Sequence, residues 1–258
     1  MAVVVLMLSS YVFIAWIRRA RGLPRPRDAI GPAMVSGGAL AVGLLSAMLL
    51  ALGAERLPVA VGFRSSALPV LLTVAFVLCL AAAWSLIRWQ NSLALVGAGL
   101  SMSLACIAVQ VGWLLAAGFR PGLVWNLPLA GGAAIAALVG CTAAMWLAYS
   151  DDSSTGARRT LWRAGAVTLM VFTVVASQEV LITAAGLAVQ ISSTYRGELS
   201  STWLMLIAGA AVPTVMALMA LDVVLRDHGD RHQSRRSPTG VELDLRRHRQ
   251  RRRKYRTL

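Results

Sequence analysis

The sequence predicts an all-α integral membrane protein with seven transmembrane helices, and three observations support this class. Hydrophobic residues make up 57% of the 258 residues, whereas charged residues make up only 14%. Soluble domains carry about 25% charged residues, so the deficit favours a membrane protein. Long apolar runs recur along the chain without strand-like alternation, and helices satisfy their own backbone hydrogen bonds in lipid. No P-loop, dinucleotide fingerprint, GxSxG, HExxH or kinase signature occurs, so we expect no enzymatic activity.

Seven apolar runs define the predicted spans. A spanning helix needs about 20 apolar residues, and six of the runs meet this length. The first run is shorter and begins directly after Met1, so we expect either a marginal span or a true start of the chain upstream of Met1. Together the runs form a predicted seven-helix transmembrane domain over residues 1–225. The runs cover residues 2–17, 33–54, 67–89, 92–118, 122–149, 164–189 and 200–225.

Arginines are distributed unevenly between the loops that join these spans. Positively charged loops stay on the cytoplasmic side, so we expect the N-terminus outside and the C-terminus in the cytoplasm. The Arg- and Ala-rich composition indicates a GC-rich genome, and the expected location is therefore a bacterial plasma membrane. The loop after the first span carries Arg18, Arg19, Arg21, Arg25 and Arg27, and the loop after the fifth carries Arg158, Arg159 and Arg163.

Residues 226–258 differ in composition from the spans. After Asp227 the sequence reads HGDRHQSRRSPTG over residues 228–240, and residues 245–258 read LRRHRQRRRKYRTL. Low hydrophobicity and a block of like charge predict a disordered basic cytoplasmic tail. Such a segment attracts the anionic headgroups of membrane lipids, which are the first predicted partner. We expect no nucleic-acid role, because aromatic residues are missing apart from Tyr255 and the tail is tethered to the membrane. The second predicted partner is a signalling protein, because no output domain follows the spans.

Glu179 lies inside the apolar run 164–189, and an intramembrane carboxylate is by default a functional-site candidate. Counted from Arg163, it lies about 24 Å along a helix, which is about four-fifths of the way through a 30 Å core. The functional interpretation is a pocket near the outer face for a small ligand or cation, with Glu179 as anchor and Gln178, Gln110 and Met48 beside it. The alternative is a Glu179 that is protonated or whose side chain snorkels to the interface.

A weak repeat relates three helix pairs. The first helix of each pair carries a polar or methionine residue near its outer end, and an aromatic residue follows at a similar spacing. The matched positions are Met48, Pro58 and Phe63, then Gln110, Pro121 and Trp125, and then Glu179 and Tyr195. This pattern resembles the MHYT family of bacterial integral membrane sensors, whose repeat has a Met-His-Tyr/Phe-Thr motif followed by a Pro and a Tyr-Asp. The resemblance covers roughly residues 1–225.

The matched residues nevertheless differ from the family's motif. Met48, Gln110 and Glu179 stand where the family has histidine, and Arg64 and Asn126 stand where it has aspartate. The family's motifs are proposed to hold copper and to sense oxygen or another diatomic gas, which requires imidazole and thioether ligands. A Met/Gln/Glu set would form at best a poor copper site, so we expect no metal and no cofactor. The chain's histidines all lie in the tail, at His228, His232 and His248.

The leading hypothesis is a seven-helix sensor-like protein, or a degenerate relative of the MHYT sensors that binds no metal, acting through a partner. One alternative is a small transporter or ion-coupled protein that uses Glu179 as a proton or cation site. A transporter needs polar residues along a path, whereas Gln110, Gln178 and Glu179 cluster at one depth. The other alternative is a structural membrane subunit.

Overall fold

The computed structural model describes residues 1–23, 25, 27–54, 62–89, 91–120, 123–150, 157–186, 192–193, 195 and 199–236. Within these residues, seven helices are long and apolar enough to cross a membrane. The predicted all-α class with seven spans is therefore confirmed, and the chain is a multi-pass membrane protein by helix length and hydropathy. The spans are Ala2–Arg21, Ile30–Ala51, Ala67–Arg88, Ser92–Ala116, Leu127–Tyr149, Thr160–Ala184 and Trp203–Arg226.

Six long helices supply the first six spans. The first is longer than the apolar run predicts, because the helix continues through three arginines in its last turn. Cations are favoured there by the negative end of the helix dipole. Asn91 caps the fourth helix, and its side chain accepts a hydrogen bond from the Ala94 N–H at 2.9 Å. The helices are α1 (Ala2–Arg21), α2 (Ile30–Ala54), α3 (Ala67–Arg88), α4 (Ser92–Ala116), α5 (Leu127–Ser150) and α6 (Ala157–Ala184).

The seventh span is not a regular α-helix. It consists of α7 (Ser201–Leu206), the π-helical segment η2 (Ile207–Ala211) and α8 (Val212–Arg236). The N–H of Val212 bonds back to the carbonyl of Ile207, which widens the turn directly before Pro213. Proline has no N–H and its ring clashes with the preceding turn, and a π-bulge accommodates both effects.

The chain divides into two compact units, residues 1–219 and residues 220–258. In the second unit, Arg226 Nε donates to Asp222 Oδ1 at 2.7 Å, an ordinary i,i+4 ion pair that the sequence also predicts. Helix α8 continues to Arg236, so it extends into the first residues of the predicted tail. The rest of the predicted tail, residues 237–258, lies outside the described residues.

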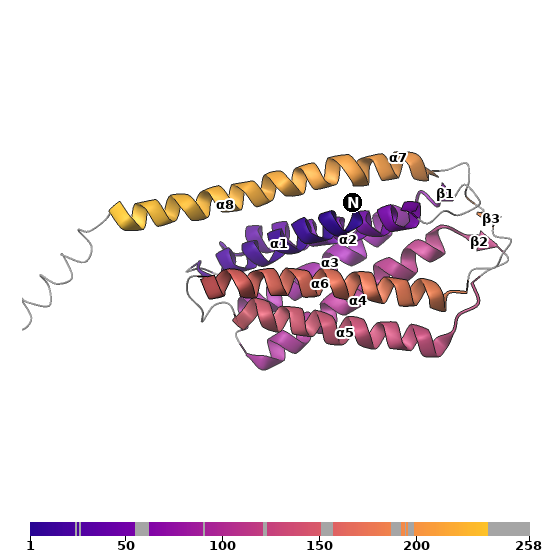
Figure 1. Cartoon of the computed structure of the whole chain (residues 1–258), viewed down its shortest axis with the longest axis horizontal. Helices are drawn as coiled ribbons and strands as arrows, with labels where there is room; N and C mark the ends of the chain where they lie inside the picture. Colours follow the sequence, from indigo (N-terminus) through magenta and orange to yellow (C-terminus); the bar gives the residue numbers. More distant parts are fainter. Residues whose placement is uncertain are drawn as a thin grey trace, which may run out of the picture. The chain divides into compact units, whose positions relative to one another are not determined.

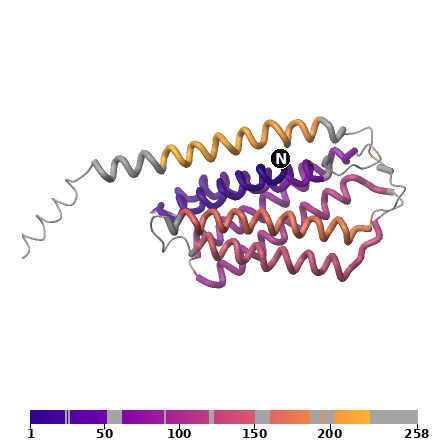
Figure 2. The backbone as a smooth tube through the Cα atoms, viewed as in Figure 1, coloured from indigo at the N-terminus to yellow at the C-terminus, as the bar shows by residue number. Residues whose placement is uncertain are grey.

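In the first unit, helices α1 to α6 pack in sequence order, and α6 returns to contact α1 (Figure 1). This arrangement forms a closed ring of six helices. Helix α4 also contacts both α2 and α6, and α7 and η2 pack against α2. Figure 2 shows the six helices of the ring running alongside one another, with the connecting segments at their ends.

Glycines allow neighbouring helices of the ring to approach closely. A Cβ atom added at any of three glycines would collide with a hydroxyl-bearing side chain of the neighbouring helix. Small residues at such contacts are typical of membrane helices, where close backbone approach replaces the hydrophobic effect. The colliding pairs are Gly43 of α2 with Ser9 of α1, Gly99 of α4 with Thr142 of α5, and Gly140 of α5 with Thr173 of α6.

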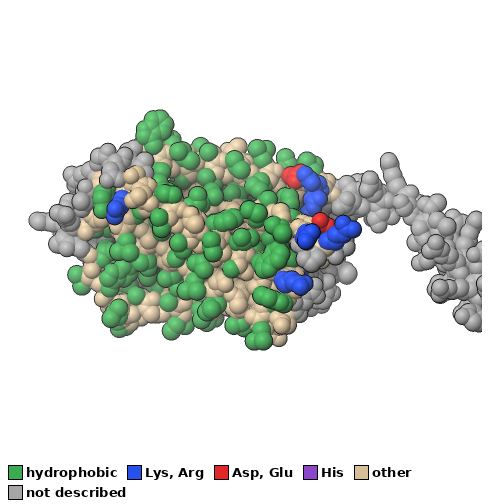
Figure 3. Space-filling model, turned by 180° about the vertical axis from the view of Figure 1, so that it is seen from behind, with side chains coloured by type: hydrophobic (Ala, Val, Ile, Leu, Met, Phe, Trp, Pro, Cys, Tyr) green, Lys and Arg blue, Asp and Glu red, His purple; other side chains and the backbone are tan. Residues whose placement is uncertain are grey.

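Two short antiparallel strand pairs join the connecting segments at one end of the ring. Strand β1 (Gly62–Phe63) pairs with β4 (Leu199–Ser200), and β2 (Phe119–Arg120) pairs with β3 (Ser192–Ser193). The segments that follow α2, α4 and α6 therefore meet one another. On the face drawn in Figure 3, hydrophobic side chains cover the middle and the drawn charged side chains lie toward the ends, as expected for a surface that meets lipid.

Candidate functional site

Helices α4 and α6 end in the same way. Each is followed by an Ala-Gly dipeptide whose glycine is left-handed, with a φ of 55° at Gly118 and 45° at Gly186. Glycine adopts this conformation without the steric cost of a Cβ atom, and it commonly terminates helices. The N–H groups of Ala117 and Ala185 bond back to the carbonyls four residues earlier. Two helices of the predicted repeat thus share one C-terminal geometry.

The last carbonyl of each of these helices accepts a hydrogen bond from an earlier connecting segment. The Arg64 N–H donates to the Ala116 carbonyl at 3.1 Å, and the Asn126 N–H donates to the Ala184 carbonyl at 2.8 Å. Arg64 and Asn126 are the two residues that the sequence comparison places at the same position of the repeat. The segment that connects the two helices of one pair therefore closes the end of the first helix of the next pair, and this happens twice in succession. This recurrence supports the helix-pair repeat on geometric grounds.

The shared ending also fixes the alignment between α4 and α6. Gln110 lies eight residues before Gly118, and Gln178 lies eight residues before Gly186. The structure therefore matches Gln110 with Gln178, whereas the sequence comparison matches it with Glu179. The difference is one residue, which corresponds to a rotation of roughly 100° around the helix.

Gln110 joins α4 to α6 by hydrogen bonds. Its side chain is buried, and its Nε2 donates to Ser177 Oγ at 3.0 Å and to the Val174 carbonyl at 3.2 Å. Ser177 Oγ in turn donates to the same carbonyl at 3.0 Å. Hydrogen bonds between membrane helices contribute about 0.6 kcal/mol on average, so this group stabilises the α4–α6 contact only modestly.

Two polar atoms beside this group have no hydrogen-bond partner among the described residues. They are Gln110 Oε1, an acceptor, and Trp113 Nε1, a donor, and both are buried. The two side chains lie one helical turn apart on the same face of α4. The Phe63 ring packs edge-on against Trp113, with ring centroids 4.8 Å apart. We call Gln110, Trp113 and Ser177 the Gln110 cluster.

Sequence reasoning did not single out Trp113 or Ser177 as site residues. The i,i+3 spacing of Trp113 from Gln110 was the available signal for the first. Nothing in the sequence places Ser177 against α4, because that contact depends on how two helices far apart in sequence rotate toward each other. The structure supplies this rotation.

The other predicted site residues separate into two groups. Met48 on α2 and Gln178 on α6 are buried, with exposed fractions of 2% and 4%, as is Gln110 with 1%. Glu179 is exposed. The structure therefore encloses three of the four side chains in the ring, and the ligand-binding role of all four stays a prediction.

Glu179 lies on the opposite face of α6 from the Gln110 cluster. At about 100° per residue it is rotated by roughly 200° from Ser177. It is also five residues from the end of α6 at Ala184, a rise of about 7.5 Å. A carboxylate at that depth can extend to the interface, where its charge is hydrated. The sequence predicts that Glu179 and Gln110 face one pocket, but the structure places Glu179 on an exposed face of α6, away from Gln110. This placement fits the alternative in which the Glu179 side chain snorkels to the interface.

Three buried thiols approach one another in the ring. Cys79, Cys106 and Cys141 come from α3, α4 and α5, and all three are free and buried. Cys106 and Cys141 lie close enough to hydrogen bond. Among the described residues, no three or more His, Cys, Asp or Glu side chains form a group that could hold a metal ion. We therefore treat the thiols as packed core residues.

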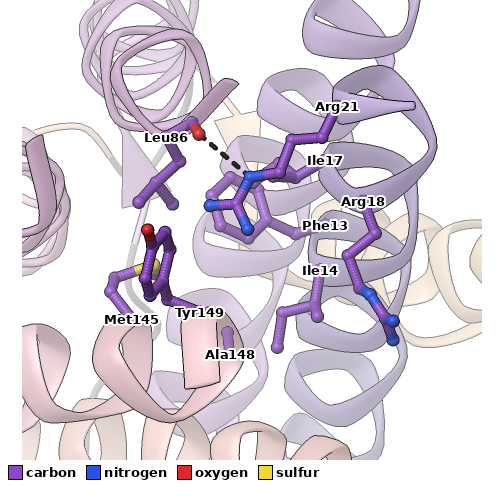
Figure 4. A pocket seen from close by; sticks show the side chains of 9 residues that line it. All are labelled: Phe13, Ile14, Ile17, Arg18, Arg21, Leu86, Met145, Ala148 and Tyr149. Atoms are coloured by element: carbon purple, nitrogen blue, oxygen red, sulfur yellow. Dashed lines mark hydrogen bonds between the residues drawn. The ribbon is translucent and has the colours of Figure 1, made fainter. Parts of the chain in front are cut away.

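Arg21 occupies the end of the ring opposite the strand pairs. Its Nε donates to the Leu86 carbonyl of α3 at 3.0 Å, and its guanidinium group lies 5.1 Å from the ring centre of Tyr149 on α5 (Figure 4). The side chains shown there border a cavity of about 10 Å³, which has room for about one water molecule. Arg21 is therefore held between three helices rather than extended into solvent.

Comparisons with known proteins add no relative: no family model matches the chain, and neither does any curated protein or solved structure. The resemblance to the MHYT sensors thus stays a prediction that depends on the spacing of the repeat. The functional interpretation must come from the site's own geometry.

Proposed function

We propose that this protein is a sensor-like multi-pass membrane protein, a relative of the MHYT sensors that binds no metal. In this proposal the Gln110 cluster receives a small neutral polar ligand, and a partner protein receives the signal. The observation that carries the proposal is the pair of buried atoms without a hydrogen-bond partner among the described residues, Gln110 Oε1 and Trp113 Nε1. Buried polar groups are almost always hydrogen-bonded, so such a pair needs an explanation.

The chemistry of the cluster favours a neutral ligand. A carbonyl oxygen and an indole N–H one turn apart can bind a molecule that offers both a donor and an acceptor, such as an alcohol or an amide. The side chains of the cluster are uncharged, and burying a charged ligand without a counter-charge is costly. The amide, indole N–H and hydroxyl of the cluster are not the thiolate, thioether or imidazole ligands that copper prefers, which supports a metal-free site.

The same geometry offers a route for a signal. The Gln110 amide bridges α4 and α6, so a ligand that bonds to this amide competes with or reorients the bridge. A ligand shifts a conformational equilibrium only by its difference in affinity for the two states. In the proposal, the two states differ in the α4–α6 contact, and the partner protein recognises that difference.

A ligand screen tests the proposal. We would measure the melting temperature of the purified protein in nanodiscs with a panel of small alcohols, amides and N-heterocycles, and separately with copper(I). Compounds that bind the cluster should stabilise the wild type and Glu179→Gln equally, and should have no effect on Gln110→Leu or Trp113→Phe. Stoichiometric copper(I) binding that Met48→Leu abolishes would contradict the metal-free proposal. Stabilisation that is equal in all variants would contradict the ligand site.

The transporter alternative has less structural support. It requires Glu179 to share a path with the other polar residues, whereas Glu179 lies on the opposite face of α6 from the Gln110 cluster. Proton- or ion-coupled flux in liposomes that disappears in Glu179→Gln would favour this alternative over the sensor. The same flux retained in Glu179→Gln would remove Glu179 from any transport role.

A further inference from the structure

A second cavity lies where α1 and α3 end, beside the segment that connects α1 to α2. Its volume is about 200 Å³, and three arginines line it: Arg21, Arg25 and Arg88. Trp84 and Ile87 of α3 and Leu23 of the connecting segment form part of the remaining wall. We call it the arginine cavity. It is separate from the Gln110 cluster, which lies toward the end of the ring that carries the strand pairs.

The charged side chains that line the arginine cavity are all of one sign, and the nearby Asp28 of the connecting segment does not line it. Among the described residues that line it, three are arginines and none is acidic. Like charges around one cavity repel, and a bound anion removes that repulsion. The planar guanidinium group matches phosphate oxygens with two parallel hydrogen bonds, and it is more weakly hydrated than an ammonium group. The chemistry of the lining therefore fits an anion with several oxygens, such as a phosphate group.

One of the three arginines is held in position before any ligand binds. The bond from Arg21 Nε to the Leu86 carbonyl and the contact with the Tyr149 ring fix its guanidinium group between α1, α3 and α5 (Figure 4). Arg25 and Arg88 are more exposed and complete the rim from two other segments. Fixing a side chain in advance lowers the entropic cost of binding. One arginine fixed in the wall and two exposed arginines suit an anion that arrives from the surface.

The position and the apolar part of the wall identify the source of the phosphate. The cavity lies at the ends of two spanning helices, at the depth where lipid headgroups meet the protein. Indole rings such as that of Trp84 favour this depth. Pockets for drug-sized molecules measure about 300–1,000 Å³, so the arginine cavity accommodates a headgroup rather than a larger metabolite. Basic pockets between membrane helices are known to take phospholipid headgroups.

We propose that the arginine cavity is a specific binding site for the phosphate headgroup of an anionic phospholipid. This site holds one lipid in a defined place, unlike the diffuse attraction expected of the basic tail. It is independent of the proposed ligand of the Gln110 cluster, and either proposal can fail without the other.

The test compares two charge-matched double variants of the full-length chain. Arg25→Gln/Arg88→Gln removes two arginines that line the cavity, whereas Arg19→Gln/Arg27→Gln removes two arginines near the same end that do not line it. Each protein is reconstituted with phosphatidylglycerol in a phosphatidylcholine background, and native mass spectrometry counts the retained lipids. A parallel series replaces the lipid with inorganic phosphate. Melting temperatures in pure phosphatidylcholine check that both variants fold.

The wild type and the Arg19/Arg27 variant should each retain one tightly bound phosphatidylglycerol. The Arg25/Arg88 variant should bind it at least tenfold more weakly, because it loses two charge-assisted hydrogen bonds to the phosphate, each of which contributes about fivefold or more. Equal retention in both variants would leave only diffuse attraction and overturn the proposal. Inorganic phosphate that displaces the lipid completely at millimolar concentration would identify free phosphate as the ligand instead. If the Arg25/Arg88 variant does not fold, Arg88→Gln alone, at an exposed position, replaces it. This single variant should bind phosphatidylglycerol about fivefold more weakly than the wild type.

Discussion

Helices α4 and α6 share their backbone ending and a buried glutamine, but only α6 also carries a carboxylate. Both end before a left-handed glycine, and both have their last carbonyl closed by the connecting segment of the preceding helix pair. The matched residues Gln110 and Gln178 are both buried, yet only α6 adds a carboxylate at the next position, on its exposed face. The comparison teaches that the repeat preserves the backbone geometry. It also separates Glu179 from the site that the repeat defines.

The largest expected effect concerns the close approach of α4 to α5. In Gly99→Ala the added Cβ atom would lie 2.8 Å from the Thr142 Cα, and backbone cannot rotate away as a side chain can. Overpacking of this kind typically costs about 1–3 kcal/mol, and we expect a value near the upper end. The matched control is Gly97→Ala in the same helix, where a Cβ atom meets nothing within 4 Å. Thermal unfolding in detergent should show a large loss for the first variant and no loss for the second.

The next effect tests the shared ending itself. Gly186→Ala forces an alanine into the left-handed region, which costs about 1–2 kcal/mol, and its Cβ atom would lie 2.8 Å from the Val124 carbonyl oxygen. Gly165→Ala in α6 is the control, because its Cβ atom meets nothing within 4 Å. An unfolding temperature of Gly186→Ala equal to that of the control would contradict the proposed role of the helix ending.

A smaller effect distinguishes the two faces of α6. Gln110→Leu removes the hydrogen bonds to Ser177 and Val174 and should lower the free energy of unfolding by about 0.5–1.5 kcal/mol. A double-mutant cycle of Gln110→Leu with Ser177→Ala should show coupling between the two sites. The same cycle with Glu179→Leu in place of Ser177→Ala should be additive, since Glu179 lies on the other face. Coupling to Glu179 of the same size would place it in the cluster after all.

The smallest expected effect is that of Glu179 alone. Glu179→Gln should change the free energy of unfolding by less than about 0.5 kcal/mol, because surface substitutions away from special features rarely exceed that value. Glu179→Leu should be neutral or stabilising, since it removes a carboxylate from a surface that meets lipid. Chemical or thermal unfolding in nanodiscs measures both. A loss above 2 kcal/mol in either variant would mean that Glu179 has a partner in the native assembly.

The sequence predicts the spans well because hydropathy is a local property that each segment carries by itself. It does not predict the interruption at η2, although Pro213 is the residue that explains it. The one-residue difference at Glu179 arises because the spacing to the aromatic residues beyond the helix crosses connecting segments whose lengths vary. The Ala-Gly pairs at Gly118 and Gly186 were the better anchor, since they mark the helix ends directly.

Features that combine distant segments could not be read from the sequence. The arginine cavity is one example, because Arg88 meets Arg21 and Arg25 only after α3 packs beside α1. The approach of Cys106 to Cys141 depends in the same way on the order of helices around the ring. Local hydropathy patterns predict where the helices lie in the sequence. The rotation of each packed helix about its own axis decides which polar side chains contact one another.

Disulfide cross-linking between α4 and α6 tests the central claim most directly. The native cysteines Cys79, Cys106 and Cys141 are first replaced by alanine, and cysteine pairs are then introduced at 110 with 177 and at 110 with 179. The account predicts efficient cross-linking of Gln110→Cys with Ser177→Cys by a bis-methanethiosulfonate reagent with a two-carbon bridge, which makes up for the shorter cysteine side chain at 110, because Gln110 Nε2 and Ser177 Oγ are 3.0 Å apart. It predicts no cross-linking of Gln110→Cys with Glu179→Cys. Equal or greater cross-linking of the 110–179 pair would contradict the account and return Glu179 to the centre of the site.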